Sequence, residues 1–377
     1  VYVLDTEAPV EIMVWIPQLK AFCTAEDMTH NMHNLQTLRG AKVRNGLLWS
    51  KAVDTAIERY GNQVEVSFST HHWPTWGNER IVDYWEAQRD MYRYLHDQTL
   101  HLANRGLTPD EIAEEMKLPA SLSSQFNCRG YYGTLSHNVK AQYDLYFGWF
   151  NGNPAHLNPL PPSELGAKYV EAIGGADKVL EVAKASYAKG EYRWVATLLD
   201  NLVFAEPENK EARQLLADTY TQLGYQAESG PWRNFYLTGA RDLFKKDVPY
   251  TSQLINDGVL AQMDMGTLLD YCAIQLNGEK AAGKKAVINI NFTDTKEKVM
   301  LMLNNGVLNH RLDSQYEKAD LTLEIEKMNF VKLFFGRTDL QTLLKTDKVK
   351  TTGNTQAMDV ICSAYEPADP NFKIVLP

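Results

Sequence analysis

Cysteine is scarce in this sequence, and no CxxC pair is present. The missing pair excludes a zinc ribbon or a thioredoxin-type site. No apolar run approaches the roughly 20 residues that a membrane helix needs. The first residues also lack the order of charged, apolar and small segments that is typical of a signal peptide. These absences predict a chain without an integral membrane segment, and they leave its compartment open.

Positive charge is scarce as well. The chain has 38 Lys and Arg against 47 Asp and Glu, for a formal charge of −9 at pH 7. Binding to a nucleic-acid backbone needs clustered basic residues, and we find no basic stripe, so nucleic acid is excluded as a partner. With 377 residues, of which 44% are hydrophobic, the chain is long enough for two or three packed domains.

The predicted fold is multidomain, with an α/β, an all-α and an α+β part. Residues 1–107 alternate short strands with helices, as in an α/β layer structure. Residues 108–248 are helical, and residues 249–377 form a small α+β domain. The sequence starts with apolar, β-prone residues, as though inside a strand, so we expect the first domain to be incomplete. In this domain we expect strands at 11–16 and 64–69 and helices at 47–60 and 81–104.

The helical part opens with a clear start signal. In TPDEIAEEM, Thr108 is the predicted N-cap, Pro109 the first helical residue and Glu111 the capping-box partner. A weak repeat follows, because AKGEY at Gly190 and TQLGY at Gly224 lie 224 − 190 = 34 residues apart, the period of tetratricopeptide arrays. The repeat units are too few for a solenoid, which favours a helical layer packed on a neighbouring domain or a second subunit.

In the last part, turn signals at TDT and NNG separate strands, and ADLTLEIEKMNFVKLFFG passes from strand to helix. Four apolar residues of this helix are either core or the lining of an apolar-ligand tunnel: Phe330, Leu333, Phe334 and Phe335.

The stretch CTAEDMTHNMHNLQTLRGAKVR carries unusual polar residues. Glu26, His30 and His33 are spaced i, i+4 and i+7, so a helix here would present all three on one face. One carboxylate and two imidazoles can hold zinc. The alternative without a metal is that the three residues form a polar helix face in contact with solvent.

Two further groups are candidates. In STHHWPTWG, His71 and His72 follow a β-prone run, on a loop at a strand's C-terminal end where active sites of α/β layers collect. They are either metal ligands or packed histidines. In RGAKVR, Arg39 and Arg44 either grip an oxyanion with forked, charge-assisted hydrogen bonds or lie on the surface.

Several long motifs resemble those of one enzyme family. They are DTEAPVE, CTAEDMTHNMHNLQTLRGAKVR, STHHWPTWGNERIVDYW and CRGYYGTLSHNVKAQYDLYFGWFNGNPAHLNPLPP, with the alanine-rich helical segment and the terminal α+β domain. They resemble the alkyl sulfatases of the metallo-β-lactamase superfamily, over essentially the whole chain. The resemblance implies a partial metallo-β-lactamase-like catalytic domain, a helical dimerisation domain and a C-terminal domain similar to sterol carrier protein 2.

The resemblance also implies roles for single residues. Glu7 in TEAP and Glu26 in AED look like carboxylate ligands of a two-zinc centre, and His71 in HHWP looks like a third ligand. His30 and His33 belong to the motif but are not ligands on this reading.

The substrate residues follow from the same resemblance. Arg39 and Arg44 look like the clamps on the sulfate, and His137 in YGTLSHN resembles the histidine that protonates the leaving sulfate. The implied substrate is a linear alkyl sulfate such as dodecyl sulfate, and the implied assembly is a homodimer. Export to the periplasm or medium of a bacterium is compatible with the family.

One family motif is absent. The HxHxDH cluster, which supplies the other zinc ligands, occurs nowhere in the 377 residues. We therefore expect a two-zinc site that is completed by residues missing from this chain, and we expect the chain alone to bind zinc weakly and hydrolyse nothing at a useful rate. The alternatives are a non-catalytic dimerising fragment that binds apolar or detergent-like ligands, and a different metallo-β-lactamase-like hydrolase.

Overall fold

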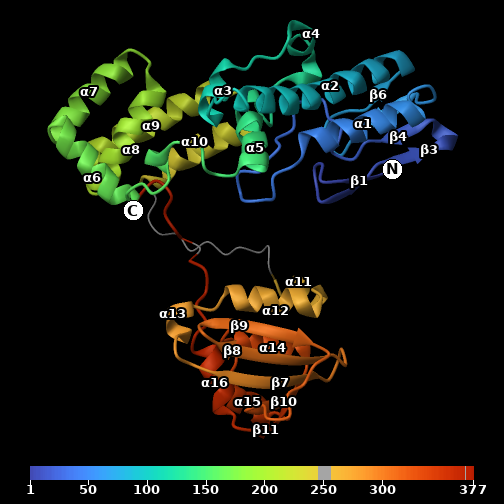
Figure 1. Ribbon diagram of the computed structural model, residues 1–377, viewed down its shortest axis with the longest axis vertical. Helices are drawn as coiled ribbons and strands as arrows, with labels where there is room; N and C mark the ends of the chain where they lie inside the picture. The colour runs from blue at the N-terminus through green and yellow to red at the C-terminus, as the bar shows by residue number, and fades with distance from the viewer. Residues whose placement is uncertain (245–255, 370) are drawn as a thin grey trace. The chain divides into compact units, whose positions relative to one another are not determined.

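The computed structural model describes residues 1–244, 256–369 and 371–377. The chain divides into two compact units, one formed by Val1–Lys245 with Lys373–Pro377 and the other by Lys246–Phe372 (Figure 1). The predicted boundary at 248 and 249 lies outside the described residues.

The first part of the first unit is an α/β layer. Its four-stranded sheet has the order β3-β4-β5-β6, in which only β4 and β5 are parallel, and β1 and β2 form a separate antiparallel pair. The strands are β1 (Tyr2–Leu4), β2 (Val10–Ile12), β3 (Val14–Ile16), β4 (Ala21–Cys23), β5 (Val66–Phe68) and β6 (Thr75–Trp76), with a 3-10 helix at Pro17–Leu19. The expected run at 11–16 is thus two strands, with Met13 between them.

Two helices cover this layer, α1 (Gly46–Tyr60) and α2 (Asn78–Ala103), close to the predicted bounds. The side chain of Asn45 caps α1 by accepting from two backbone amides of the first turn. The two helices pack together through buried aromatic residues, and the rings of Trp49 and Tyr92 stack with centroids 4.6 Å apart. The candidate site lies next to this pair of rings, because His33 contacts both of them.

The predicted helix through Glu26, His30 and His33 is wrong. The structure has no helix or strand between Cys23 and Gly46, and the segment is an irregular loop. Thr24 donates to the carbonyl of Met28 at 2.8 Å. Such short-range bonds from threonine and asparagine side chains compete with the helical ladder.

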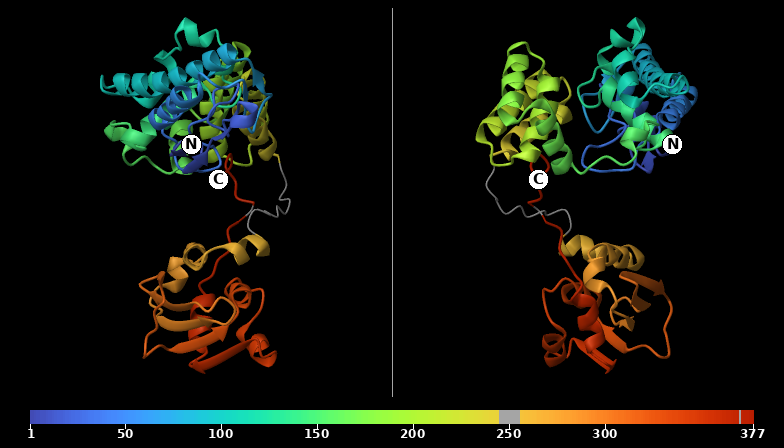
Figure 2. Two further views of the ribbon diagram at one scale, coloured as in Figure 1. Left: turned by 90° about the vertical axis from the view of Figure 1, so that its right-hand side faces the viewer. Right: turned by 60° about the vertical axis from the view of Figure 1, so that its left-hand side comes forward.

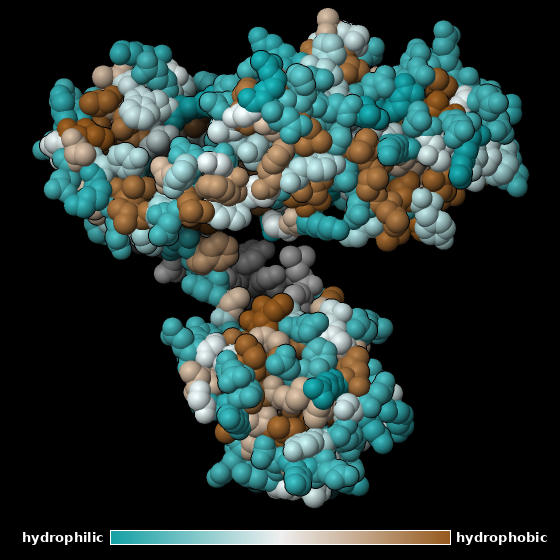
Figure 3. Space-filling model, viewed as in Figure 1, coloured by the Kyte–Doolittle hydropathy of each residue, from teal (hydrophilic) through white to brown (hydrophobic). Residues whose placement is uncertain are grey.

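The β1–β2 hairpin leaves apolar side chains on the surface (Figure 3). The exposed residues of this patch are Tyr2, Leu4, Val10, Ile12 and Val14.

The rest of the first unit is helical, and helices α6 to α10 pack as a layer (Figure 2). The capping box of Thr108 and Glu111 is present as predicted. Ala183 and Ala217, which have the 34-residue spacing of the weak repeat (217 − 183 = 34), are both buried. The helices are α3 (Pro109–Glu115), α4 (Ala120–Ser123), α5 (Leu135–Phe147), α6 (Pro162–Ile173), α7 (Ala176–Ala188), α8 (Tyr192–Ala205), α9 (Lys210–Gln226) and α10 (Gly230–Asp242), with 3-10 helices at Phe126–Cys128 and Pro154–His156.

The second unit is the predicted α+β domain. Its five-stranded sheet has the order β11-β10-β7-β8-β9, with β7 and β10 parallel. Phe330, Leu333 and Phe334 are buried in its core, which favours the core interpretation over a ligand tunnel. The strands are β7 (Ala286–Phe292), β8 (Lys298–Asn304), β9 (Val307–Leu312), β10 (Leu321–Ile325) and β11 (Val349–Gly353). The helices are α11 (Asp257–Gln262), α12 (Met265–Ile274), α13 (Gly278–Ala281), α14 (Lys327–Phe334), α15 (Leu340–Lys345) and α16 (Gln356–Cys362).

Among the helices of the described residues, none combines the length and the apolar character that a membrane span requires.

The contact between α6 and α8 gives a test of the helical layer. A Cβ added at Gly166 would lie 2.4 Å from the carbonyl oxygen of Asn201, whereas one added at Gly239 in α10 would meet only ordinary contacts at 3.5 Å or more. We expect Gly166→Ala to lower the free energy of unfolding by about 2 kcal/mol. Gly239→Ala is the matched control and should raise it by up to about 1 kcal/mol, because alanine favours the helix.

Urea denaturation followed by tryptophan fluorescence measures both variants. All eight tryptophans precede residue 245, so the signal reports the first unit alone. Equal stabilities of the two variants would show that α6 and α8 are not in close contact.

Candidate metal and anion site

The loop between β4 and α1 brings a carboxylate and an imidazole together. Glu26 Oε2 lies 3.5 Å from Nε2 of His33, and Glu26 Oε1 lies 3.0 Å from Nε2 of His71, which follows β5. The hydrogen bond from His33 is the main reason that the pKa of Glu26 falls to about 2, against the opposing effect of burial. Glu26 is therefore ionised at neutral pH and available to a cation.

Glu7, on the turn between β1 and β2, completes a cluster with these residues. Ligand atoms of Glu7, Glu26 and His33 all lie within 4.8 Å of one another. Two carboxylates and one imidazole form a donor set that suits zinc. The structure thus fits the predicted carboxylate ligands Glu7 and Glu26. It places His33 in the cluster, while His71 contacts Glu26 from its exposed loop, and the ligand role of His71 stays a prediction.

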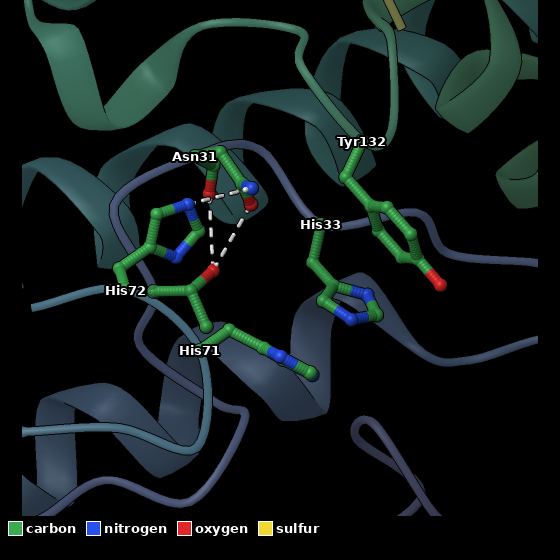
Figure 4. Close-up of a pocket in the computed structure, with 6 residues that line it drawn as sticks. Asn31, His33, His71, His72 and Tyr132 are labelled. Carbon is green, nitrogen blue, oxygen red and sulfur yellow. Dashed lines mark hydrogen bonds between the residues drawn. The ribbon is translucent and has the colours of Figure 1, made fainter. Parts of the chain in front are cut away.

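A pocket of about 240 Å³ opens beside this cluster (Figure 4). In Figure 4 the rings of His33, His71 and Tyr132 surround one space, with His72 at its other side. His72 lies 3.3 Å from the amide nitrogen of Asn31. The complete lining is Thr29, Asn31, His33, His71, His72 and Tyr132.

Three residues of the pocket lining were not candidates from the sequence, Thr29, Asn31 and Tyr132. The aromatic one is Tyr132. It lies in the CRGYYGTLSHN block, but no spacing rule singles it out. His30 lies outside the lining, where its Nε2 is 2.9 Å from the hydroxyl of Thr75 and its ring packs against Tyr84.

Arg44 is buried and bound to the acidic cluster. Its guanidinium group forms an ion pair with the carboxylate of Glu7. Its Nη1 donates to the side-chain oxygen of Asn34 at 2.6 Å and to the carbonyl of Asn34 at 2.9 Å. Arg39 is exposed, and no hydrogen bond or ion pair of it occurs within the described parts of the chain. The structure therefore brings only one of the two predicted sulfate clamps to the site.

His137 lies outside the pocket lining. Its Nε2 donates to the carbonyl of Gln36 at 2.7 Å, and its Nδ1 accepts from the indole of Trp232 at 3.2 Å. Burial lowers its pKa. Because both ring nitrogens are engaged, this geometry does not favour the predicted role as proton donor, which stays a prediction.

Two more carboxyl groups lie next to the cluster, the buried Asp27 and the half-buried Glu11. Asp27 is fully buried and neither of its oxygens has a hydrogen-bond partner in the described chain. Burial raises the pKa of both Asp27 and Glu11 to about 7. These two groups therefore hold a proton more readily than Glu26 does.

Comparison with known proteins finds two matching family models and several relatives of high similarity. The family model for alkyl sulfatase dimerisation matches residues 108–246, and that for the alkyl sulfatase C-terminal domain matches residues 253–377. A linear primary-alkylsulfatase of Pseudomonas sp. (strain ATCC 19151) is 31% identical, over 97% of this chain and 71% of the relative. The chain belongs to the alkyl sulfatase family. The predicted resemblance is confirmed.

Other relatives in the family are more similar but longer. A second linear primary-alkylsulfatase, from Pseudomonas sp., is 45% identical over 100% of this chain and 56% of its own length. The solved structure of the inverting sec-alkylsulfatase Pisa1 from Pseudomonas sp. matches with a TM-score of 0.96 and 40% identity, over 99% of this chain and 59% of that chain. The chain thus spans a little more than half the length of these relatives, and the Pisa1 match confirms the predicted fold class.

The two arginines offer a matched test of the site. Arg44→Met leaves the carboxylate of Glu7 and the oxygens of Asn34 without their cation, so we expect the free energy of unfolding to fall by about 3 kcal/mol. Arg39→Met removes an exposed charge and should change it by less than about 0.5 kcal/mol. Urea denaturation checks both, and a cost of Arg44→Met as small as that of Arg39→Met would contradict the buried pairing.

Proposed function

We propose that this chain carries part of the active site of an alkyl sulfate hydrolase, which converts linear alkyl sulfates such as dodecyl sulfate to an alcohol and inorganic sulfate. The convergence of Glu7, Glu26 and His33 beside the pocket carries this proposal. The similarity to alkylsulfatases supports the substrate class.

Zinc is the proposed cofactor, two ions per complete site. Glu7, Glu26 and His33 offer ligand atoms to one ion, and His71 lies beside Glu26. When bound, zinc polarises an ester oxygen and lowers the pKa of water near it. Three or four groups cannot fill the coordination of two ions, so residues that this chain does not carry complete the site.

Arg44 is the proposed sulfate-binding residue. Its guanidinium group is paired with Glu7 in the structure, so it can hold a sulfate only when the carboxylate is released. With Glu7 engaged as a metal ligand, the guanidinium group of Arg44 would be available to a permanent anion. Arg39 approaches the substrate from the surface in this proposal.

The family resemblance assigns to His137 the proton for the leaving sulfate. A group that lines the pocket is the better candidate, because His137 already uses both ring nitrogens. The protein acts as a homodimer, which the match of 108–246 to the dimerisation model supports.

Complementation tests the proposed activity. We expect this chain alone to release no sulfate from dodecyl sulfate, and a mixture with the N-terminal portion of the 45%-identical Pseudomonas enzyme to release it. In the mixture, Glu26→Gln should lower the rate about 100-fold or more, because even partners outside the ligand shell contribute 10- to 100-fold. Glu58→Gln, on the exposed face of α1, is the control and should leave the rate unchanged.

Three results would contradict the proposal. Turnover by the chain alone, or near-stoichiometric binding of two zinc ions by it, would show that the site is complete. Binding of dodecyl sulfate without turnover in the mixture would favour the non-catalytic binder.

A further inference from the structure

The loop that carries the site has no secondary structure to satisfy its backbone hydrogen bonds. Residues 31–46 contain Asn31, His33, Asn34 and Arg44 but no helix or strand before α1 begins at Gly46, and most of the first half of this stretch is buried. Buried backbone amides and carbonyls need hydrogen-bond partners, and here the ladder of a regular element does not supply them. One partner lies within the loop, where the amide of Arg44 donates to the carbonyl of Leu35 at 2.8 Å, and others come from another element.

Helix α5 supplies them through two side-chain amides. Asn138 accepts from the backbone amide of Leu35 at 2.8 Å and donates to the carbonyl of His33 at 2.9 Å. Gln142 accepts from the amide of Gly46 at 3.0 Å and donates to the carbonyl of Arg44 at 2.9 Å.

Both side chains are fully buried, at 0% exposed. They are four residues apart and therefore lie on one face of the helix. Each uses a donor and an acceptor on the loop, so neither amide group can turn over without breaking two bonds.

Helix α5 makes a third contact with the loop, through His137. His137 donates to the carbonyl of Gln36, and Trp232 of α10 donates to its other ring nitrogen, which fixes the ring and its tautomer. The turn before α5 also fits closely, because a Cβ added at Gly133 would lie 2.5 Å from the carbonyl oxygen of His33. The backbone at His33 is therefore held from two sides.

We propose that Asn138 and Gln142 are positioning residues of the site. Asn138 fixes the backbone at His33, so that its Nε2 points at Glu26. Gln142 fixes the backbone at Arg44, so that its guanidinium group reaches Glu7. The part of this proposal that concerns zinc rests on the proposed function, whereas the hydrogen bonds do not.

Removal of one amide has a predictable effect. Asn138→Leu keeps the size of the side chain and leaves the carbonyl of His33 and the amide of Leu35 unpaired in a buried place. The loop then relaxes, and His33 loses its fixed direction toward Glu26. The matched control is Thr99→Val in α2. It removes an equally buried hydroxyl, which donates a hydrogen bond to the carbonyl of Leu95 in the same helix.

The first measurement is the affinity of the folded 377-residue chain for Zn²⁺, by competition with a chromophoric chelator. We expect Asn138→Leu to weaken binding by about 10-fold or more, in the range found for groups that orient metal ligands. The Zn²⁺ affinity of Thr99→Val should stay within about twofold of that of the parent chain, even where its melting temperature falls as much as that of Asn138→Leu. Equal affinities of the two variants would overturn the positioning role.

The second measurement is amide hydrogen exchange. We expect Asn138→Leu to remove the protection of the Leu35 amide, and Gln142→Met that of the Gly46 amide, while Thr99→Val leaves both unchanged. Where these variants do not fold, Asn138→Asp and Gln142→Glu keep an accepting oxygen, and at a pH where the new carboxyl group is ionised they replace the amide donor by an oxygen that repels the carbonyl of His33 or Arg44. Unchanged loop protection in variants without the Leu35 or Gly46 acceptor, or unchanged Zn²⁺ affinity in Asn138→Asp with its carboxyl group ionised, would overturn the proposal. A parent chain that binds no Zn²⁺ would instead refute the metal site of the proposed function, and exchange alone would then decide the positioning claim.

Discussion

The site depends on the hydrogen bonding of one buried loop without secondary structure. Between β4 and α1 the chain places His33 and Arg44 at fixed positions although no helix or strand holds them. The cost of burying unpaired backbone groups is comparable to that of a lost hydrogen bond for each group, so this geometry exists only where other elements supply partners. Asn138 and Gln142 of α5 do so at both ends of the stretch.

Electrostatics explains the second half of the arrangement. Glu7, Glu11, Glu26 and Asp27 lie close together, and like charges at such distances cannot all ionise without compensation. Arg44 compensates Glu7, and hydrogen bonding to His33 is the largest cause of the low pKa of Glu26. Among the described residues neither Glu11 nor Asp27 forms an ion pair, and burial raises the pKa of each to about 7. A divalent cation at the cluster would relieve the same repulsion, which is a physical reason for these acids to gather beside the pocket.

Local signals predicted the regular elements well and the site loop badly. The helices α1 and α2 and the capping box of Thr108 follow from periodicity and from capping chemistry, which act over a few residues. The helix through Glu26, His30 and His33 has the right spacing, yet the loop is stabilised by Asn138, which lies 103 residues from Leu35 in the sequence. No local pattern contains such a partner. For the same reason Tyr132 was missed. His33 was a ligand candidate by its spacing but was set aside under the family resemblance, from which the roles of Glu7, Glu26 and Arg44 were taken.

The helical part therefore contributes to the geometry of the site. The region that matches the dimerisation model begins at residue 108, and it contains α5 and also α10, whose Trp232 holds His137. Ser229 at the start of α10 donates to the carbonyl of Tyr132 at 2.7 Å, next to the pocket. A shift of α10 relative to α5 would consequently move groups on both sides of Tyr132 and strain the bonds that fix His33 and Arg44. Since packed elements of this kind respond to displacement by discrete rearrangement rather than by smooth deformation, the geometry of the site depends on how α5 and α10 pack within the region that matches the dimerisation model.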